Sequence, residues 1–110
     1  MERESLAGIR IRVCKVEGNC SVYKGGEVIT IDGPEIDMRR SDRICIHALA
    51  PILHYVVALR EGVDPKVLGL SKGGKDDQKA AYIACVDPGP PFTDGGRVIF
   101  EMTRIDDQNL

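Results

Sequence analysis

Apolar and polar residues alternate along residues 9–16, which is the clearest pattern in the chain. Isoleucines and valines fall on one face of this segment and two arginines on the other, as in a strand with one buried side. Three more segments have the composition and the flanking turn residues of strands: 28–31, 81–86 and 97–105. We expect the first two strands to pair as a hairpin whose connection, around Cys20, is longer than a tight turn.

One segment has the period of an amphipathic helix. Its apolar stripe consists of Ala48, Ile52, Tyr55, Val56 and Leu59. Pro51 fits only the first turn of a helix, where its missing N–H would have no intrahelical partner anyway. We therefore start the helix near His47 and take Gly62 as the residue after its end. A helix that began at Ser41 instead would be kinked by the proline.

Four strands and one principal helix predict an α+β domain, in which the helix packs on one face of a small, mostly antiparallel sheet. The 110 residues suffice for a single domain, with 1–7 expected as a loose N-terminal segment and 106–110 as a loose tail. Residues 35–43 contain three arginines. We interpret this segment as a solvated connection in preference to an anion-binding loop.

Composition narrows the function classes. Hydrophobic residues make up 43% of the chain and charged residues 29%, which fits a folded core rather than a disordered chain. The formal net charge of −2 argues against broad electrostatic binding of nucleic acid. The charged N-terminus has no apolar run behind it, and the mostly apolar stretch 44–59 is too short to span a bilayer. We therefore expect a cytoplasmic protein with no membrane partner.

Residues 69–75 have the spacing G-x-x-x-x-G-K of a phosphate-binding loop, but Asp76 stands where Mg²⁺ coordination needs a Ser or Thr hydroxyl. A carboxylate at that position would repel phosphates, so no nucleotide cofactor is expected. No acid–base pair is evident either, and a domain of this size offers little room for a deep catalytic cleft. A binding or assembly role is therefore favoured over self-sufficient catalysis.

The cysteines are the most suggestive chemistry in the chain. Cys20 lies in a glycine-containing turn, Cys45 just ahead of the predicted helix, and Cys85 at a strand end before a proline-rich turn. All three are at the ends of elements, where sites are commonly built. Cys14 lies within the first strand and is expected to be structural. In a reducing cytosol these residues are free thiols or ligands, but each one alone is more typical of a small buried core residue.

Two uses of these thiols remain open besides packing. In the first, Cys20, Cys45 and Cys85 bind a metal ion and His47 or solvent completes the set, which suits Zn²⁺ and, less well, an iron–sulfur centre. His54 is seven residues from His47, about 10 Å along a helix, so the two imidazoles cannot share one ion. In the second, Cys45 is a redox nucleophile, because a helix N-terminus stabilises a thiolate.

The chain resembles a family of short, uncharacterised bacterial and archaeal proteins over residues 11–105. The residues that carry the resemblance are Gly18, Cys20, Lys24, Gly26, Cys45, Ala48, Cys85, Asp87, Phe100 and Arg104. The chain departs from the family pattern in having Ile46 and Val86 where proline often follows the second and third cysteines. The resemblance implies a shared role for the three matching thiols but no particular activity.

Self-association is also expected, most simply as a two-fold dimer. A sheet of about four strands leaves two edges, and the segment 97–105 has little charge to protect it as an edge strand. The helix also carries Leu49, Leu53 and Val57 outside its main apolar stripe. Closed two-fold symmetry is the commonest way to bury such surface.

Overall fold

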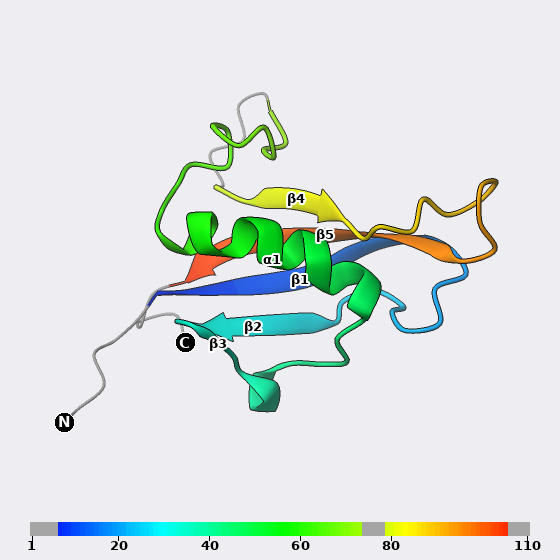
Figure 1. The fold of residues 1–110 in the computed structure, drawn as a ribbon, viewed down its shortest axis with the longest axis horizontal. Helices are drawn as coiled ribbons and strands as arrows, with labels where there is room; N and C mark the ends of the chain where they lie inside the picture. The colour runs from blue at the N-terminus through cyan, green and yellow to red at the C-terminus, as the bar shows by residue number, and fades with distance from the viewer. Residues whose placement is uncertain (1–6, 74–78, 106–110) are drawn as a thin grey trace.

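The computed structural model describes residues 7–73 and 79–105, in which five strands form one antiparallel sheet with the order β3-β2-β1-β5-β4 (Figure 1). The elements are β1 (Gly8–Gly18), β2 (Val28–Asp32), β3 (Glu35–Ile36), the 3₁₀ helix η1 (Met38–Arg40), α1 (Ile46–Arg60), β4 (Ala81–Ala84) and β5 (Gly96–Ile105). The α+β class with one principal helix on an antiparallel sheet is thus confirmed. The segments expected to be loose, 1–7 and 106–110, lie outside the described residues except for Ala7.

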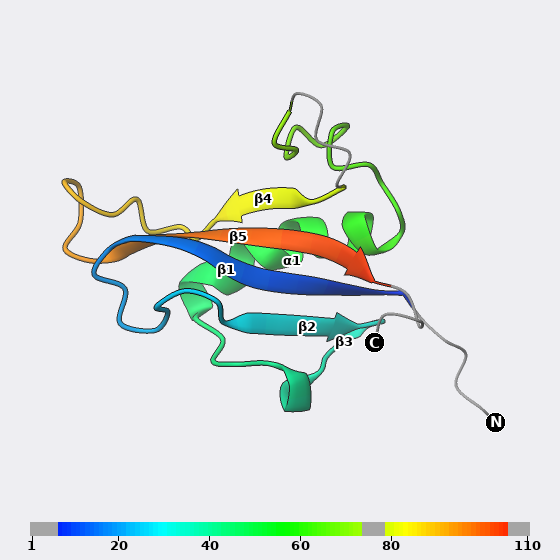
Figure 2. The same cartoon turned by 180° about the vertical axis from the view of Figure 1, so that it is seen from behind.

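The core lies between α1 and one face of the sheet. Seen from behind, the described strands lie in front of α1 and no described helix covers their other face (Figure 2). The alternation predicted for β1 is confirmed, since its isoleucines and Val13 are buried and Arg10 and Arg12 are exposed. The largest fully buried side chains are Tyr23, Phe100, Ile9, Ile11, Ile52 and Met102. Each such apolar side chain contributes about 1.5–3 kcal/mol through burial.

The pairing of β1 with β5 shifts register between Val13 and Lys15. Cys14 lies at this irregularity rather than in a regular strand position opposite the core. An extra residue of this kind locally breaks the ladder and bends the strand. The strand pairing also corrects a prediction about edges, because β5 lies between β1 and β4 and is not an edge strand. The two edges of the sheet are the short strands β3 and β4.

Residues 35–43, predicted as a solvated connection, contain β3 and η1. The side chain of Asp37 accepts a hydrogen bond from the N–H of Arg39 and pairs with the guanidinium of Arg40 at 2.6 Å. The hydrogen bond from Arg40 holds the pKa of Asp37 below its usual range. The buried Thr30 of β2 donates its hydroxyl to the carbonyl of Arg40 at 2.6 Å, which fixes the segment against the sheet.

The helix begins one residue earlier than predicted, with Cys45 as its N-cap, and Pro51 lies inside the helix rather than in its first turn. The proline has no N–H for the carbonyl of His47, four residues earlier. That carbonyl instead accepts the N–H of Val86 at 3.0 Å. A tertiary hydrogen bond thus replaces the helical one, which is why the rule that confines proline to the first turn failed here. Within the described residues, no helix has the length and apolar character needed to cross a membrane.

Candidate functional site

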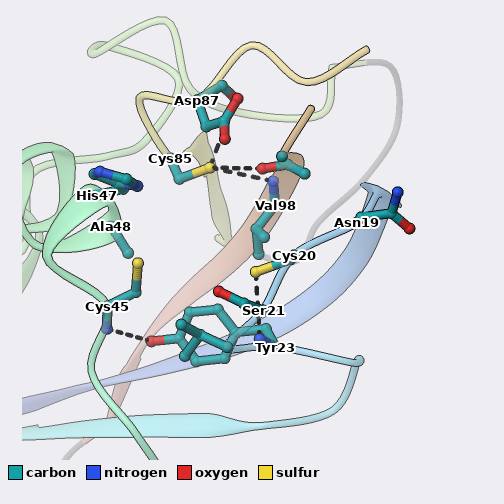
Figure 3. A pocket seen from close by; sticks show the side chains of 13 residues that line it. Asn19, Cys20, Ser21, Tyr23, Cys45, His47, Ala48, Cys85, Asp87 and Val98 are labelled. Atoms are coloured by element: carbon teal, nitrogen blue, oxygen red, sulfur yellow. Dashed lines mark hydrogen bonds between the residues drawn. The ribbon is translucent and has the colours of Figure 1, made fainter. Parts of the chain in front are cut away.

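Cys20, Cys45 and Cys85 come from three separate segments of the chain and line a single pocket of about 240 Å³. His47 and Asp87 also line it, while Cys14 and His54 are not among its lining residues. Figure 3 shows the three sulfur atoms directed toward the space between the helix start, β5 and the turn that follows β1. The structure therefore brings together the residues that the sequence proposed as ligands.

Cys20 is positioned by the turn that follows β1. Its sulfur accepts a hydrogen bond from the N–H of Tyr23 at 3.3 Å, and the neighbouring Asn19 donates its N–H to the carbonyl of Gly95 at 3.1 Å. The turn packs directly on Gly96, where an added Cβ would lie 2.5 Å from the backbone nitrogen of Cys20. Only a glycine at this position allows the turn to approach β5 so closely.

Tyr23 links this turn to the start of the helix. Its hydroxyl accepts the N–H of Cys45 at 3.0 Å and donates to the carbonyl of Arg43 at 2.7 Å. The ring is buried and meets Phe100 edge to face, with 5.7 Å between ring centroids. Burial raises the pKa of the Tyr23 hydroxyl above its usual value, although the hydrogen bond from Cys45 acts in the opposite direction. Tyr23 thus sets the position of Cys45 relative to Cys20.

Cys45 is the N-cap residue of α1, and its side chain lines the pocket. Its carbonyl accepts the N–H groups of Ala48 and Leu49, at 3.0 and 3.1 Å. The side chain makes no capping hydrogen bond with the described helix. The sulfur therefore lies at the N-terminal end of α1 and lines the pocket.

Cys85 directly follows β4 and continues its pairing with β5. Its N–H donates to the carbonyl of Val98 at 3.0 Å, and its sulfur accepts the N–H of Val98 at 3.3 Å. The next residue, Val86, donates to the carbonyl of His47 that Pro51 leaves free. This bond joins the segment of Cys85 to the first turn of α1, beside Cys45.

Asp87 and His47 form the polar side of the pocket. The carboxylate of Asp87 accepts hydrogen bonds from the Thr93 hydroxyl and from the N–H of Gly89. The Thr93 bond is the largest cause of the lowered pKa of Asp87, followed by the Gly89 bond, with a smaller contribution from the charge of His47. The carboxylate and the imidazole are therefore close enough to interact electrostatically.

The four cysteines are free thiols, and no group of three or more His, Cys, Asp or Glu side chains in the described part of the chain could hold a metal ion as placed. A metal in this pocket would require side-chain rotation. The metal role of Cys20, Cys45, Cys85 and His47 stays a prediction.

Several residues that build the site have no functional signature in the sequence. Tyr23, Pro51 and Gly96 act through tertiary contacts, and no local pattern marks them. The spacing G-x-S-x-G, the pattern of a nucleophile elbow, also occurs at 69–73. The residues that precede Ser71 form turns rather than the strand that such an elbow requires. The last two residues of the segment with phosphate-loop spacing, 74 and 75, and the Asp76 that follows lie outside the described residues.

Fold and pocket together define a small α+β domain with a thiol-lined cavity. No family model, curated protein or solved structure matches the chain. The resemblance noted in the sequence therefore remains an expectation, and the functional argument depends on the pocket itself.

Proposed function

We propose that this protein is a small binding module, without self-sufficient catalysis, whose ligand site is the pocket lined by Cys20, Cys45 and Cys85. One observation carries the proposal: three of the four cysteines, far apart in the sequence, line the same pocket. Two of their sulfurs also accept backbone N–H groups, and the third lies at a helix N-terminus. Each of these arrangements places a sulfur near backbone N–H groups, and the Cys85 thiol also donates to the carbonyls of Asp87 and Gly96, each at 3.7 Å.

The chemistry of the lining indicates the class of ligand. Thiolates are soft donors, so they prefer soft or borderline metal ions and thiophilic electrophiles to hard, oxygen-loving cations. The apolar part of the lining includes Val22, Ala48 and Val98, which limits hydration of a bound group. Free thiols persist in a reducing compartment, and we therefore place the module in the cytoplasm.

Phenylarsine oxide is expected to bind the protein in a ratio of one arsenic per chain. A trivalent arsenical condenses with two neighbouring thiols, so that two As–S bonds form and the oxygen leaves as water. Intact-mass spectrometry of the reduced protein measures the adduct. Cys14→Ser is expected to bind as the unchanged chain does. Cys20→Ser combined with Cys85→Ser leaves one pocket thiol and is expected to lose the adduct. An adduct that disappears with Cys14→Ser would place the paired thiols elsewhere.

We also propose that the module self-associates through the outer face of α1. Ile46, Leu53 and Val57 are 78%, 54% and 54% exposed, and the helix carries no Lys, Arg, Asp or Glu before Arg60. A helix face of this composition is typical of a contact between subunits. With both sheet edges short, the helix face offers the larger apolar surface for a two-fold dimer.

Sedimentation velocity is expected to give twice the 12.0 kDa of one chain. Leu53→Lys introduces a charge on the helix face and is expected to give monomers. Val67→Lys is the matched control, because Val67 is 78% exposed but lies outside α1. A 12.0 kDa species for the unchanged chain at micromolar concentration would exclude the dimer.

A further inference from the structure

We infer that the pocket is a zinc site in which Cys20, Cys45 and Cys85 supply three sulfur ligands and His47 supplies a nitrogen. The inference deepens the proposed binding function and depends on it. Three thiolates and one imidazole form a donor set that Zn²⁺ takes in tetrahedral geometry. All four residues line the pocket, and they come from three segments of the chain that the fold brings together.

Two of the four ligands are held in place by the fold. The sulfur of Cys20 accepts the N–H of Tyr23, and that of Cys85 accepts the N–H of Val98, each at 3.3 Å. Hydrogen bonds of this kind strengthen when the thiol becomes a thiolate. The Cys85 thiol also donates to the carbonyls of Asp87 and Gly96, each at 3.7 Å, and these two contacts are lost when it gives up its proton. They correspond to the outer-shell contacts that orient metal ligands in established sites.

The other two ligands are held less firmly by their side chains, although Cys45 is partly buried against the core. The side chain of Cys45 makes no capping bond to the described helix, and His47 is exposed. Rotation between staggered conformers of such side chains has a low energetic cost. We therefore propose that Cys45 and His47 rotate toward the ion when zinc binds. This accounts for the lack of a closed ligand group among the described side chains.

The main-chain positions of Cys45 and His47 favour this rotation. The Val86 N–H bonds the carbonyl of His47, and the Cys45 N–H bonds the hydroxyl of Tyr23, so that both rotating residues are anchored through their main chains. Asp87 also lines the pocket, and we expect its carboxylate to accept the ring N–H of His47 that does not face the metal once the imidazole has rotated. A carboxylate in that place fixes the orientation of a ligating imidazole.

Binding exchanges protons for zinc. Each thiol that coordinates gives up its S–H proton, the sulfur lone pair forms the Zn–S bond, and one proton is released for each thiol bound. No electron is transferred and no co-reactant is needed. Zinc affinity is therefore expected to rise with pH, and the protons released in a weakly buffered solution count the thiols that bind.

The test uses the whole reduced chain, freed of metal with a chelator and titrated with Zn²⁺ against a competing chelator dye. We expect one zinc per chain and a dissociation constant in the nanomolar range or below, on the order of that of other sites with several thiolates. Cys20→Ser, Cys45→Ser and Cys85→Ser are each expected to weaken binding by at least about 100-fold, more than the loss of an outer-shell partner. Cys14→Ser is the matched control and is expected to bind normally.

Cobalt(II) provides a readout of the ligand set. In the unchanged chain it is expected to show the strong visible bands of a tetrahedral site and thiolate-to-cobalt charge transfer. His47→Gln is expected to shift the visible bands, whereas His54→Gln leaves them unchanged. Circular dichroism of the metal-free variants checks folding, and Cys45→Ser is well suited to the purpose because serine is itself a favoured N-cap.

The outcomes separate the two proposals. Failure of zinc to bind, together with normal capture of phenylarsine oxide, would overturn the zinc site and leave the binding module intact. Failure of both probes would overturn both. Zinc binding that depends on Cys14, or that is unaffected by His47→Gln, would overturn the proposed ligand set. Iron and sulfide in place of zinc, found in protein purified without a chelator, would also overturn it.

Discussion

Tyr23→Phe is expected to lower the free energy of unfolding by about 1–3 kcal/mol, the cost of leaving buried polar groups without partners. The substitution keeps the ring and its edge-to-face contact with Phe100 but removes the hydroxyl. The N–H of Cys45 and the carbonyl of Arg43 then lose their partner in the part-buried space before α1. Urea unfolding monitored by circular dichroism measures the change.

The same residue predicts a pH dependence. Because the folded protein raises the pKa of Tyr23, the folded state favours the neutral hydroxyl. This preference contributes to the free energy of unfolding. The contribution is fully present below the pKa of tyrosine in the unfolded chain, about 10, and is lost as the pH rises through the pKa of Tyr23 in the folded protein. The difference in stability between the unchanged chain and Tyr23→Phe is therefore expected to narrow in strongly alkaline solution.

Tyr55→Phe is the control for this prediction. Tyr55 is half-buried on α1, and its ring lies 4.6 Å from that of His54, away from the residues that line the pocket. A destabilisation by Tyr23→Phe no larger than that by Tyr55→Phe would contradict the role assigned to the Tyr23 hydroxyl.

Gly96→Ala is expected to have the second large effect, a loss of about 1–3 kcal/mol from overpacking. The new Cβ would lie 2.5 Å from the nitrogen of Cys20 and 2.9 Å from its Cβ. The obstruction comes from backbone rather than from the end of a flexible side chain, so the turn that carries Cys20 has to move. Zinc affinity and arsenical capture are expected to fall with stability.

Gly69→Ala is the control that distinguishes the steric clash at Gly96 from the loss of stability that any replacement of a glycine can cause. Gly69 has φ of +73°, which disfavours alanine, but an added Cβ there meets nothing within 4 Å. It is therefore expected to lose some stability while retaining normal capture of phenylarsine oxide. Normal capture by Gly96→Ala would contradict the close packing of Cys20 on β5.

The fold class was predictable because its signals are local. The alternation along β1 and the apolar stripe of α1 each follow from side-chain direction within one element. The order of the strands carries no such signal, so the sequence does not reveal that β5 pairs with both β1 and β4 and is not an edge. The two-residue strand β3 is too short for any periodic pattern.

The sequence predicted the reactive residues of the candidate site but not the residues that position them. Placement at element ends drew attention to Cys20, Cys45 and Cys85, and these residues do line one pocket. The residues that hold them have no sequence signature. Pro51 acts by leaving the carbonyl of His47 for Val86, a partner well beyond the helix in sequence. Such an effect exists only once the tertiary structure is formed.

The central claim, that the three thiols share one binding site, is tested most directly by labelling each cysteine with iodoacetamide in the presence and absence of one equivalent of phenylarsine oxide. Peptide mass spectrometry then reports the labelling rate of every cysteine. Because each phenylarsine oxide binds two thiols, we expect the protection to be shared among Cys20, Cys45 and Cys85, two of them in any one molecule, and the labelling of Cys14 to be unchanged. Protection that includes Cys14, or no protection of the pocket cysteines, would contradict the claim.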